Sequence, residues 1–175
     1  MIPSTDHIAS VLNNGGLVVI RTDTLYGIVA RADNEAAVDK VFRIKKRNPK
    51  KSCILLIAHR DQAYGDMSNL SYDNNEPTSI LVESPNAPSW LLRANSELAY
   101  RIPNNAFLVE LLEKTGPLIA PSANIEGEQP AGTIEEARAI FEENIDLYVD
   151  GGTVPDDTPP SRLIRYIDGG IERLR

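Results

Sequence analysis

Residues 17–27 read LVVIRTDTLYG, a short apolar run followed directly by a polar loop. The run at 17–20 shows no alternation of apolar and polar side chains, which is typical of a strand buried on both faces of a sheet. Residues 21–27 then place several hydroxyl groups just after the end of that strand. Ligands of open α/β sheets collect at the carboxyl ends of strands. This stretch therefore indicates both a fold class and the position of a polar site.

Helices are predicted on both sides of this first strand. Residues 4–14 begin with Ser, Thr and Asp, whose side chains cap helices, and a Gly-Gly pair follows as a stop signal. A second helix is expected from a cap at Asp33 or Asn34 to about Arg47, because its apolar residues recur at helical spacing. The first strand therefore lies between two helices in the chain.

The remainder of the chain continues this alternation. Further strands are expected at residues 53–57, 90–93, 98–102, 118–120, 147–149, 162–167 and 171–175. Further helices are expected at residues 78–82, at 106–114, and from a capping box at Thr133 and Glu136 to about residue 141. Residues 61–88 are the least regular part and are compatible with a lid or a recognition surface. The pattern predicts an α/β fold with a largely mixed open sheet flanked by helices.

Length and composition indicate one domain that covers residues 1–175. The chain is 42% hydrophobic and 25% charged, and its 175 residues are too few for two ordinary domains. No apolar run approaches the ~20 residues that span a bilayer, and the first residues lack a secretory leader. Cys53, the only cysteine, fits a buried strand and leaves no internal disulfide. We expect a cytoplasmic protein without membrane contact.

Six cations lie between residues 43 and 51, a stretch without an acidic side chain. They are Arg43, Lys45, Lys46, Arg47, Lys50 and Lys51. The whole chain carries a formal charge of -7, which disfavours a broad nucleic-acid surface. Cations near a helix C-terminus are stabilised by ~0.3–1 kcal/mol each, which explains one or two of them but not six that repel one another. The segment predicts phosphate binding in a nucleotide site, centred on Lys45 and Arg47.

Three polar loops follow buried strands, at residues 22–27, 121–127 and 150–161. They carry the hydroxyls of Thr22, Thr24, Tyr26, Ser122 and Ser161 and the amide of Asn124. Such groups hydrogen-bond a polar small molecule and hold phosphate oxygens. The alternative for any one loop is that these residues serve the turn itself. Three such loops after three strands favour a ligand site.

Several familiar sites are excluded by the motifs. There is no Gly-rich loop ending in Gly-Lys-Ser/Thr, no Gly-x-Gly-x-x-Gly and no Gly-x-Ser-x-Gly. The two histidines, His7 and His59, and one cysteine leave no histidine or thiolate metal cluster, so no protein metal site is expected. Both histidines are expected at the surface, and no side chain suggests itself as a nucleophile or general base.

The order of motifs resembles the YrdC-like family, the L-threonylcarbamoyladenylate synthases of tRNA modification. Members carry Pro-Thr-Asp/Glu-Thr-x-Tyr-Gly, then Lys-x-Arg with a later Lys or Asn, then Arg-x-Pro, then Pro-Ser-x-Asn-x-x-Gly, then Asp-Gly-Gly before Ser-Thr, and a closing arginine. In this chain the first motif corresponds to residues 21–27, and the second to Lys45–Arg47 with the later Lys51. Arg-x-Pro is residues 101–103, and Pro-Ser-x-Asn-x-x-Gly is residues 121–127. Asp-Gly-Gly is residues 150–152, ahead of Ser161, and the closing arginine is Arg175. The resemblance covers nearly the whole chain.

The resemblance implies a fold and a reaction. The fold is a twisted, mostly mixed sheet flanked by helices, with the α/β twist of the YrdC-like and double-stranded RNA-binding type and a basic concave cleft. L-threonine and bicarbonate would form threonylcarbamate, which attacks the α-phosphate of ATP and releases pyrophosphate. Mg²⁺ would accompany the nucleotide. Downstream proteins would transfer the threonylcarbamoyl group to adenosine-37 of tRNA, and direct tRNA contact would be weak.

The resemblance also implies roles for individual residues. The expected ATP contacts are Lys45, Arg47, Lys51, Ser122, Asn124 and Arg175, with Lys45 and Arg47 also stabilising the reacting phosphate. The expected threonine contacts are Thr24, Tyr26, Arg101, Ala120 and Ser161. Arg101 suits the carboxylate of threonine, because its guanidinium group is a planar fork.

The chain departs from the family pattern at several positions. Arg21 replaces a proline, Arg162 replaces a threonine after Ser161, and Leu56 stands where archaeal and eukaryotic members have a histidine. Residues 84–90 replace a Trp-Pro-Gly-Pro-x-Thr segment, and the chain resembles the single-domain form of the family. Two alternatives stay open. One is a family paralogue that binds nucleotide or RNA without this activity, and the other is a module whose basic segment docks an acidic protein.

Overall fold

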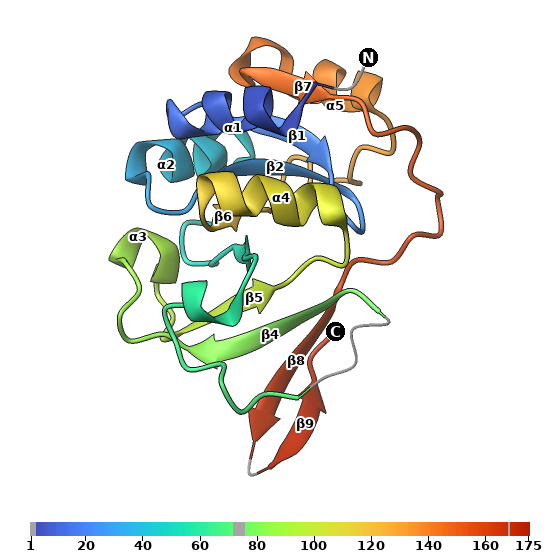
Figure 1. The fold of residues 1–175 in the computed structure, drawn as a ribbon. Helices are drawn as coiled ribbons and strands as arrows, with labels where there is room; N and C mark the ends of the chain where they lie inside the picture. Colours follow the sequence, from blue (N-terminus) through green and yellow to red (C-terminus); the bar gives the residue numbers. More distant parts are fainter. Residues whose placement is uncertain (1–2, 72–75, 168) are drawn as a thin grey trace.

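The computed structural model describes residues 3–71, 76–167 and 169–175. Their strands are β1 (Val18–Arg21), β2 (Tyr26–Arg31), β3 (Ile54–Leu56), β4 (Thr78–Glu83), β5 (Glu97–Arg101), β6 (Leu118–Ile119), β7 (Leu147–Val149), β8 (Arg162–Ile167) and β9 (Gly170–Arg173). Within these residues the strands form one sheet in the order β7-β1-β2-β6-β3-β5-β4-β8-β9. The β1–β7, β3–β5 and β4–β8 pairs are parallel and the other pairs are antiparallel. The predicted mixed open sheet is confirmed. Figure 1 shows β4, β8 and β9 running at an angle to β1 and β2, so the sheet is twisted.

Helices cover both faces of the sheet. They are α1 (Thr5–Asn13), α2 (Glu35–Ile44), α3 (Ser89–Leu92), α4 (Ala106–Thr115) and α5 (Ile134–Phe141), with short 3-10 turns at Arg60–Gln62 and Glu142–Asn144. α1 and α4 share one cluster of buried apolar residues, and α2, α3 and α5 share another. In β1, Val18 and Ile20 belong to the first cluster and Val19 to the second. Alternate side chains of a strand point to opposite faces, so β1 is buried on both, as predicted.

Side chains fix where the longer helices begin. Ser4, Asn34 and Asn105 each accept a hydrogen bond from a backbone N–H three residues later. Thr133 does the same for α5, but the predicted capping box forms only in part. The second half of the box is displaced, because Glu136 accepts from the backbone N–H of Gly132 at 2.7 Å rather than from that of Thr133.

The strand directions bring the three polar loops together. β7 runs parallel to β1, and β6 also runs in the direction of β1, because β1 and β6 are both antiparallel to β2. The loops that follow β1, β6 and β7 therefore leave the same edge of the sheet. A bridge between Gly27 and Ser122 joins the first two loops. The backbone N–H of Gly151 donates to the hydroxyl of Tyr26 and joins the third.

Three expectations for individual elements were wrong. The predicted loop 21–27 ends early, because Tyr26 and Gly27 already belong to β2, a strand that was not predicted from the sequence. Residues 78–82, expected as a helix, are part of β4, which lies between β5 and β8. Residues 90–93, expected as a strand, lie in and just after α3, where the indole N–H of Trp90 donates to the carbonyl of Ala32 at 3.0 Å. Short apolar runs suit either a helix or a strand, and pairing or packing partners decide between them.

The described part of residues 61–88 is anchored to the core at particular positions. Met67 is 2% exposed, and Gly65 lies so close to β4 that an added Cβ atom would approach the carbonyl oxygen of Glu83 to 2.1 Å. Residues 78–83 of this segment form the central strand β4 and not a lid, and residues 72–75 lie outside the described residues. Among the described helices, none is long and apolar enough to cross a membrane.

Candidate active site

The three polar loops and the basic segment surround one cavity of about 980 Å³. Its volume lies at the upper end of the ~300–1,000 Å³ found for small-molecule sites. Of the residues predicted for the site, those that line it are Thr24, Tyr26, Arg47, Lys51, Arg101, Ala120, Ser122, Ser161 and Arg175. Lys45 and Asn124 lie behind its wall. All three polar loops therefore contribute to one cavity.

The remainder of the cavity combines an apolar floor with a long crossing loop. Ile54, Leu81, Ala99 and Leu163 come from neighbouring strands of the sheet and form the apolar part. Residues 150–161 connect β7 to β8 and run along one side of the molecule (Figure 1), and several of them line the cavity. Apolar surface with a few convergent polar groups is the usual character of a ligand site.

The basic segment divides into residues that face the cavity and residues that face solvent. Arg47 lines the cavity; its Nη2 donates to the carbonyl of Ser52 at 2.6 Å, and its buried Nε makes no hydrogen bond within the described residues. Lys51 also lines the cavity and pairs with Glu126 at 2.7 Å. Arg43 and Lys46 are exposed and do not line it. Only some of the cations in the basic segment therefore contribute positive charge to the cavity.

Lys45 is buried under the loop that follows β6. Its side chain is 1% exposed, and its Nζ donates to the carbonyl of Asn124 at 2.6 Å and to the carbonyl of Ser122. The same nitrogen also donates to the amide oxygen of Asn124, at 3.3 Å. Burial lowers the pKa of Lys45 to about 8, and the nearby positive charge of Arg47 adds to that shift. In this structure Lys45 supports the wall of the cavity.

Of Ser122 and Asn124, one lines the cavity and the other supports its wall. The Ser122 hydroxyl, which lines the cavity, donates to the amide oxygen of Asn124 at 2.6 Å. The amide nitrogen of Asn124 donates to the carbonyls of Ile125 and Glu128 at 2.8 and 2.9 Å. Asn124 is 8% exposed, and its side chain is used within its own loop. Ser122 is the member of the pair with direct access to a ligand.

Tyr26 joins the loop after β1 to the long loop after β7. Its hydroxyl donates to the carbonyl of Gly152 at 2.8 Å and accepts from the N–H of Gly151 at 2.9 Å. Burial raises the pKa of Tyr26, so the hydroxyl keeps its proton at neutral pH. Thr24 is 9% exposed and lines the cavity beside it. The phenol therefore fixes the two loops that bear most of the site's hydroxyl groups.

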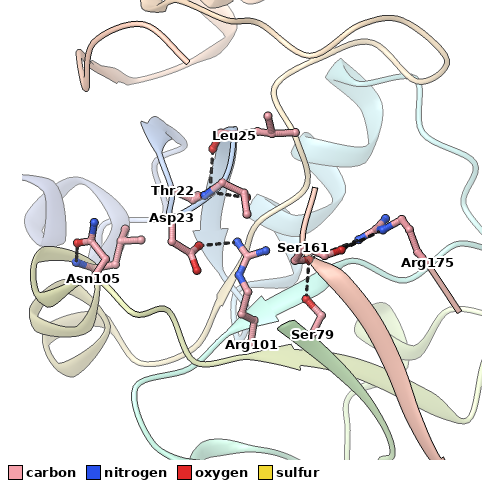
Figure 2. Close-up of polar contacts among 10 residues, drawn as sticks. Thr22, Asp23, Leu25, Ser79, Arg101, Asn105, Ser161 and Arg175 are labelled. Carbon is pink, nitrogen blue, oxygen red and sulfur yellow. Dashed lines mark hydrogen bonds and ion pairs between the residues drawn. The ribbon is translucent and has the colours of Figure 1, made fainter. Parts of the chain in front are cut away.

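Arg101 is the buried cation of the site. Its side chain is 4% exposed, and its Nη2 lies 3.1 Å from the Oδ1 of Asp23, whose side chain is 8% exposed (Figure 2). Burial lowers the pKa of Arg101, which the charge of Asp23 opposes and the positive charge of Arg175 reinforces. No role was predicted for Asp23 from the sequence. The available signal was that a buried arginine requires a carboxylate partner.

Arg175, two residues after the end of β9, lines the site. Arg175 Nε and Nη2 donate to the carbonyl of Ser161 at 3.1 and 3.0 Å. The hydroxyl of Ser161, which is 2% exposed, lies 2.9 Å from that of Ser79, as Figure 2 shows. Ala120, the residue directly after β6, also lines the cavity. Leu56, where some family members have a histidine, is fully buried among the apolar residues under α1 and α4.

The described residues hold no cluster of three or more metal-ligating side chains. Two carboxylates, Glu136 and Asp156, line the cavity and are separate acidic groups. Oxygen ligands are the kind that Mg²⁺ takes, usually one or two carboxylates together with substrate phosphates and water. The donor set of the cavity is thus compatible with a Mg²⁺ ion that arrives with a nucleotide.

Fold and site together define a class of protein. Residues 10–175 match the family model Sua5/YciO/YrdC, which is described as "Telomere recombination". The match spans nearly the whole sequence, so this chain belongs to the Sua5/YciO/YrdC family. The resemblance inferred from the order of the motifs is confirmed.

Individual relatives narrow the comparison. A threonylcarbamoyl-AMP synthase of Klebsiella pneumoniae is 32% identical over 159 residues, which cover 84% of this chain and 83% of the relative. A putative threonylcarbamoyl-AMP synthase of Methanocaldococcus jannaschii is 33% identical over 170 residues, covering 93% and 80% of the two chains. Both relatives share most of their length with this protein.

Solved structures agree on the fold. P. abyssi Sua5 in complex with L-threonine superposes with a TM-score of 0.83 at 25% identity, over 98% of this chain and 53% of that one. E. coli YciO superposes with a TM-score of 0.80 at 20% identity, over 98% and 87% of the two chains. This chain thus spans about half the length of the Sua5 chain, whereas it matches most of YciO.

Proposed function

We propose that this protein is a threonylcarbamoyl-AMP synthase. It converts L-threonine, bicarbonate and ATP to L-threonylcarbamoyl-AMP, pyrophosphate and water. One observation carries the proposal: a single cavity is lined by the buried fork of Arg101 and by the cations Arg47, Lys51 and Arg175. An amino-acid carboxylate and a triphosphate both need such groups, and one cavity brings them within reach of each other. The names of the relatives support the same activity.

The reaction has two steps in which atoms balance. The amine nitrogen of threonine bonds to the carbon of bicarbonate, water leaves, and a carbamate forms. A carbamate oxygen then bonds to the α-phosphorus of ATP, the bond from that phosphorus to the bridging oxygen breaks, and pyrophosphate leaves with the electron pair. No covalent bond to the protein is required. The protein contributes orientation and charge, which are the main sources of rate in phosphoryl-type transfers.

The nucleotide contacts follow from the cavity-lining groups. Arg47, Lys51 and Arg175 neutralise phosphate oxygens, and the hydroxyl of Ser122 donates to the nucleotide. Lys45 and Asn124 act on the nucleotide mainly through the loop that they hold around Ser122. Glu136 or Asp156, the carboxylates that line the cavity, would hold a Mg²⁺ ion that arrives with the nucleotide. The ion would withdraw charge from the phosphates.

The threonine contacts lie around Arg101. Its guanidinium group takes the carboxylate, and Thr24 and Ser161 offer hydroxyls to the polar groups of the amino acid. Tyr26 keeps the surrounding loops in place, and Ala120 leaves room for the side chain of threonine. The amine is then directed toward bicarbonate and the α-phosphate.

The product implies a place in a longer process. Threonylcarbamoyl-AMP is a mixed anhydride that water hydrolyses, so a partner that transfers the threonylcarbamoyl group to adenosine-37 of tRNA must consume it promptly. We place this work in the cytoplasm, with residues 1–175 as one functional domain and with at most weak contact between this chain and tRNA itself.

The test is a reconstitution with purified protein, Mg²⁺, ATP, L-threonine and bicarbonate. Pyrophosphate release should require all three substrates, and the nucleotide product should contain the carbon of labelled bicarbonate. Omission of threonine is the key control. Pyrophosphate that forms equally well without threonine would contradict the substrate assignment. Tight RNA binding without ATP turnover would instead favour a paralogue that lacks the synthase activity.

A further inference from the structure

Asp23 and Arg101 form a buried ion pair at the back of the cavity. Asp23 lies in the loop after β1, and Arg101 is the last residue of β5. Their closest atoms, Oδ1 and Nη2, are 3.1 Å apart, and their side chains are 8% and 4% exposed. Figure 2 shows the two side chains pointing toward each other from the two elements. The net contribution of such a buried ion pair to stability is small, so stability alone does not account for it.

The two members of the pair face different spaces. Arg101 lines the large cavity, whereas Asp23 lines a second cavity of about 580 Å³ and does not line the first. The second cavity lies between the loop after β1 and the start of α4, with Asn105 and Phe107 on its wall. Asp23 therefore approaches the guanidinium group from behind, away from the space where a ligand of Arg101 would bind.

The loop that carries Asp23 is held firmly by its two neighbours. The hydroxyl of Thr22 donates to the carbonyl of Leu25 at 2.8 Å and accepts from the backbone N–H of Thr24 at 3.2 Å. The backbone N–H of Thr22 also donates to the carbonyl of Leu25 at 3.0 Å. These bonds close a tight turn around Asp23. The carboxylate is thus presented from a fixed backbone.

The guanidinium group of Arg101 retains donors for a ligand. A guanidinium group has five N–H donors, and Asp23 lies beside only one of its terminal nitrogens. The Nε of Arg101 makes no hydrogen bond in the part of the chain that the structure describes. Arg101 lines the cavity, and paired N–H groups of a guanidinium match the two oxygens of a carboxylate.

We propose that Asp23 is a positioning residue for the threonine carboxylate. It fixes the orientation of the Arg101 guanidinium group from the side of the second cavity, so that the free N–H groups point into the first. The inference rests on the proposed function, because it names threonine as the ligand of Arg101. The opposite role would be competition, in which Asp23 occupies Arg101 and must be displaced by the substrate.

Substitution of Asp23 separates these two roles. In Asp23→Asn and Asp23→Ala we expect the KM for threonine to rise by about 10- to 100-fold, because a small misplacement of a binding group has effects of that size. The KM for ATP should stay unchanged. Asp33→Asn is the matched control, because Asp33 is exposed and pairs with Arg31 far from the site. A threonine KM that falls or stays constant in the Asp23 variants would overturn the proposal.

Chemical rescue distinguishes positioning from a general structural role. Asp23 lines the second cavity and contacts Arg101, so Asp23→Ala vacates a position beside Arg101 that a small carboxylate can fill. Formate should therefore lower the threonine KM of Asp23→Ala and leave the wild type and Asp23→Asn without such a gain. Absence of rescue, in a variant that still binds ATP normally, would show that the loss is structural and would overturn the positioning role.

Failure of the Asp23 inference can be distinguished from failure of the proposed function. If the wild type forms no threonine-dependent pyrophosphate, the function proposal fails. Calorimetric titration of threonine into wild type and Asp23→Ala, with and without formate, then still tests the positioning of Arg101. If the wild type is active and threonine binding is the same in both proteins, only the Asp23 inference fails.

Discussion

Lys45 and Arg47 are two positions apart in the sequence but face different surroundings. The side chain of Lys45 is 1% exposed and donates to the carbonyls of Ser122 and Asn124, whereas Arg47 lines the cavity. The difference arises because α2 ends at Ile44, after which the chain turns and Lys46 takes a positive φ of 49°. One cation is thereby directed under the loop after β6 and the other into the site.

Replacing each of these residues by Met should separate stability from binding. Lys45→Met leaves the buried carbonyl of Asn124 without its donor, while the carbonyl of Ser122 keeps the backbone N–H of Asn124. One unsatisfied buried carbonyl costs ~1–3 kcal/mol, so the free energy of unfolding should fall by about that amount. Arg47→Met should lose far less stability, but its Kd for ATP should rise by about tenfold or more, because a hydrogen bond to a charged group contributes ~1.5–3 kcal/mol. Urea unfolding and calorimetric titration of ATP measure the two effects. Equal losses of stability in both variants would contradict the assignment.

The pKa of Lys45 gives a second prediction, for the effect of pH on stability. The pKa is about 8 in the folded protein and 10.5 for a lysine that is fully exposed to water, so the unfolded chain binds more protons between those values. The free energy of unfolding of the wild type should therefore rise relative to Lys45→Met as the pH increases from about 8 to 10.5, by at most about 3 kcal/mol. Urea titrations of both proteins across this range measure the difference. A pH-independent difference would show that Lys45 has an ordinary pKa.

At the scale of elements, the site depends on how strands and their connections pack. β2 is buried on both sides between β1 and β6, and its first residues also shape the cavity. The connection between β3 and β4 contributes in a similar way, because Gly65 lies directly against β4. β4 in turn pairs with β5, which ends at Arg101. Packing within this half of the sheet thus supports the position of the buried arginine.

Gly65→Ala should show how close that packing is. A Cβ atom at this position would lie 2.1 Å from the carbonyl oxygen of Glu83 and 2.9 Å from Val82, so the backbone must shift. We expect a loss of about 1–3 kcal/mol in the free energy of unfolding, the usual cost of overpacking. Gly170→Ala is the control, because its nearest neighbour would be the carbonyl oxygen of Ile167 at 3.5 Å. Urea unfolding followed by Trp90 fluorescence is the measurement, and similar stabilities of the two variants would refute the close approach.

At the scale of the whole molecule, the net charge of the surface and the local charge of the cavity have opposite signs. The formal charge is -7, so the surface as a whole repels polyanions. The cations Arg47, Lys51, Arg101 and Arg175 nevertheless gather at one cavity from segments far apart in the chain. A compact anion such as a triphosphate can enter this local field. A long nucleic acid must also meet the acidic surroundings.

Weak binding of tRNA is the corresponding prediction. Proteins with a basic nucleic-acid surface bind non-specifically with a Kd of ~10⁻⁴–10⁻⁶ M at physiological salt. We expect the Kd of this protein for a labelled anticodon stem-loop to be weaker than ~10⁻⁴ M under the same conditions. Fluorescence anisotropy at about 0.15 M salt measures it, with and without excess ATP. Micromolar binding that ATP does not displace would indicate a separate RNA surface and would favour the paralogue alternative.

Much of the fold could be predicted because local patterns were strong. The capped helices at α1, α4 and α5 and the buried strand β1 follow from caps and apolar runs. β2 was missed because its first residues continue a polar motif, and β4 and α3 were exchanged because short apolar runs fit either structure. Residues 78–83 form a strand because they pair with β5 and β8, and the local sequence does not indicate that pairing.

The sequence by itself determined the class of fold, the family and the polar loops that form the site. These features depend on side-chain type, periodicity and the order of motifs, all of which are local. Only the tertiary structure decided which side chains face the cavity. It placed Lys45 and Asn124 behind the wall, and it set Asp23 against Arg101 across 78 positions of the chain. The physical reason is that burial and ion pairing depend on the relative positions of β1, β5 and the loop after β6, which the assembled sheet alone fixes.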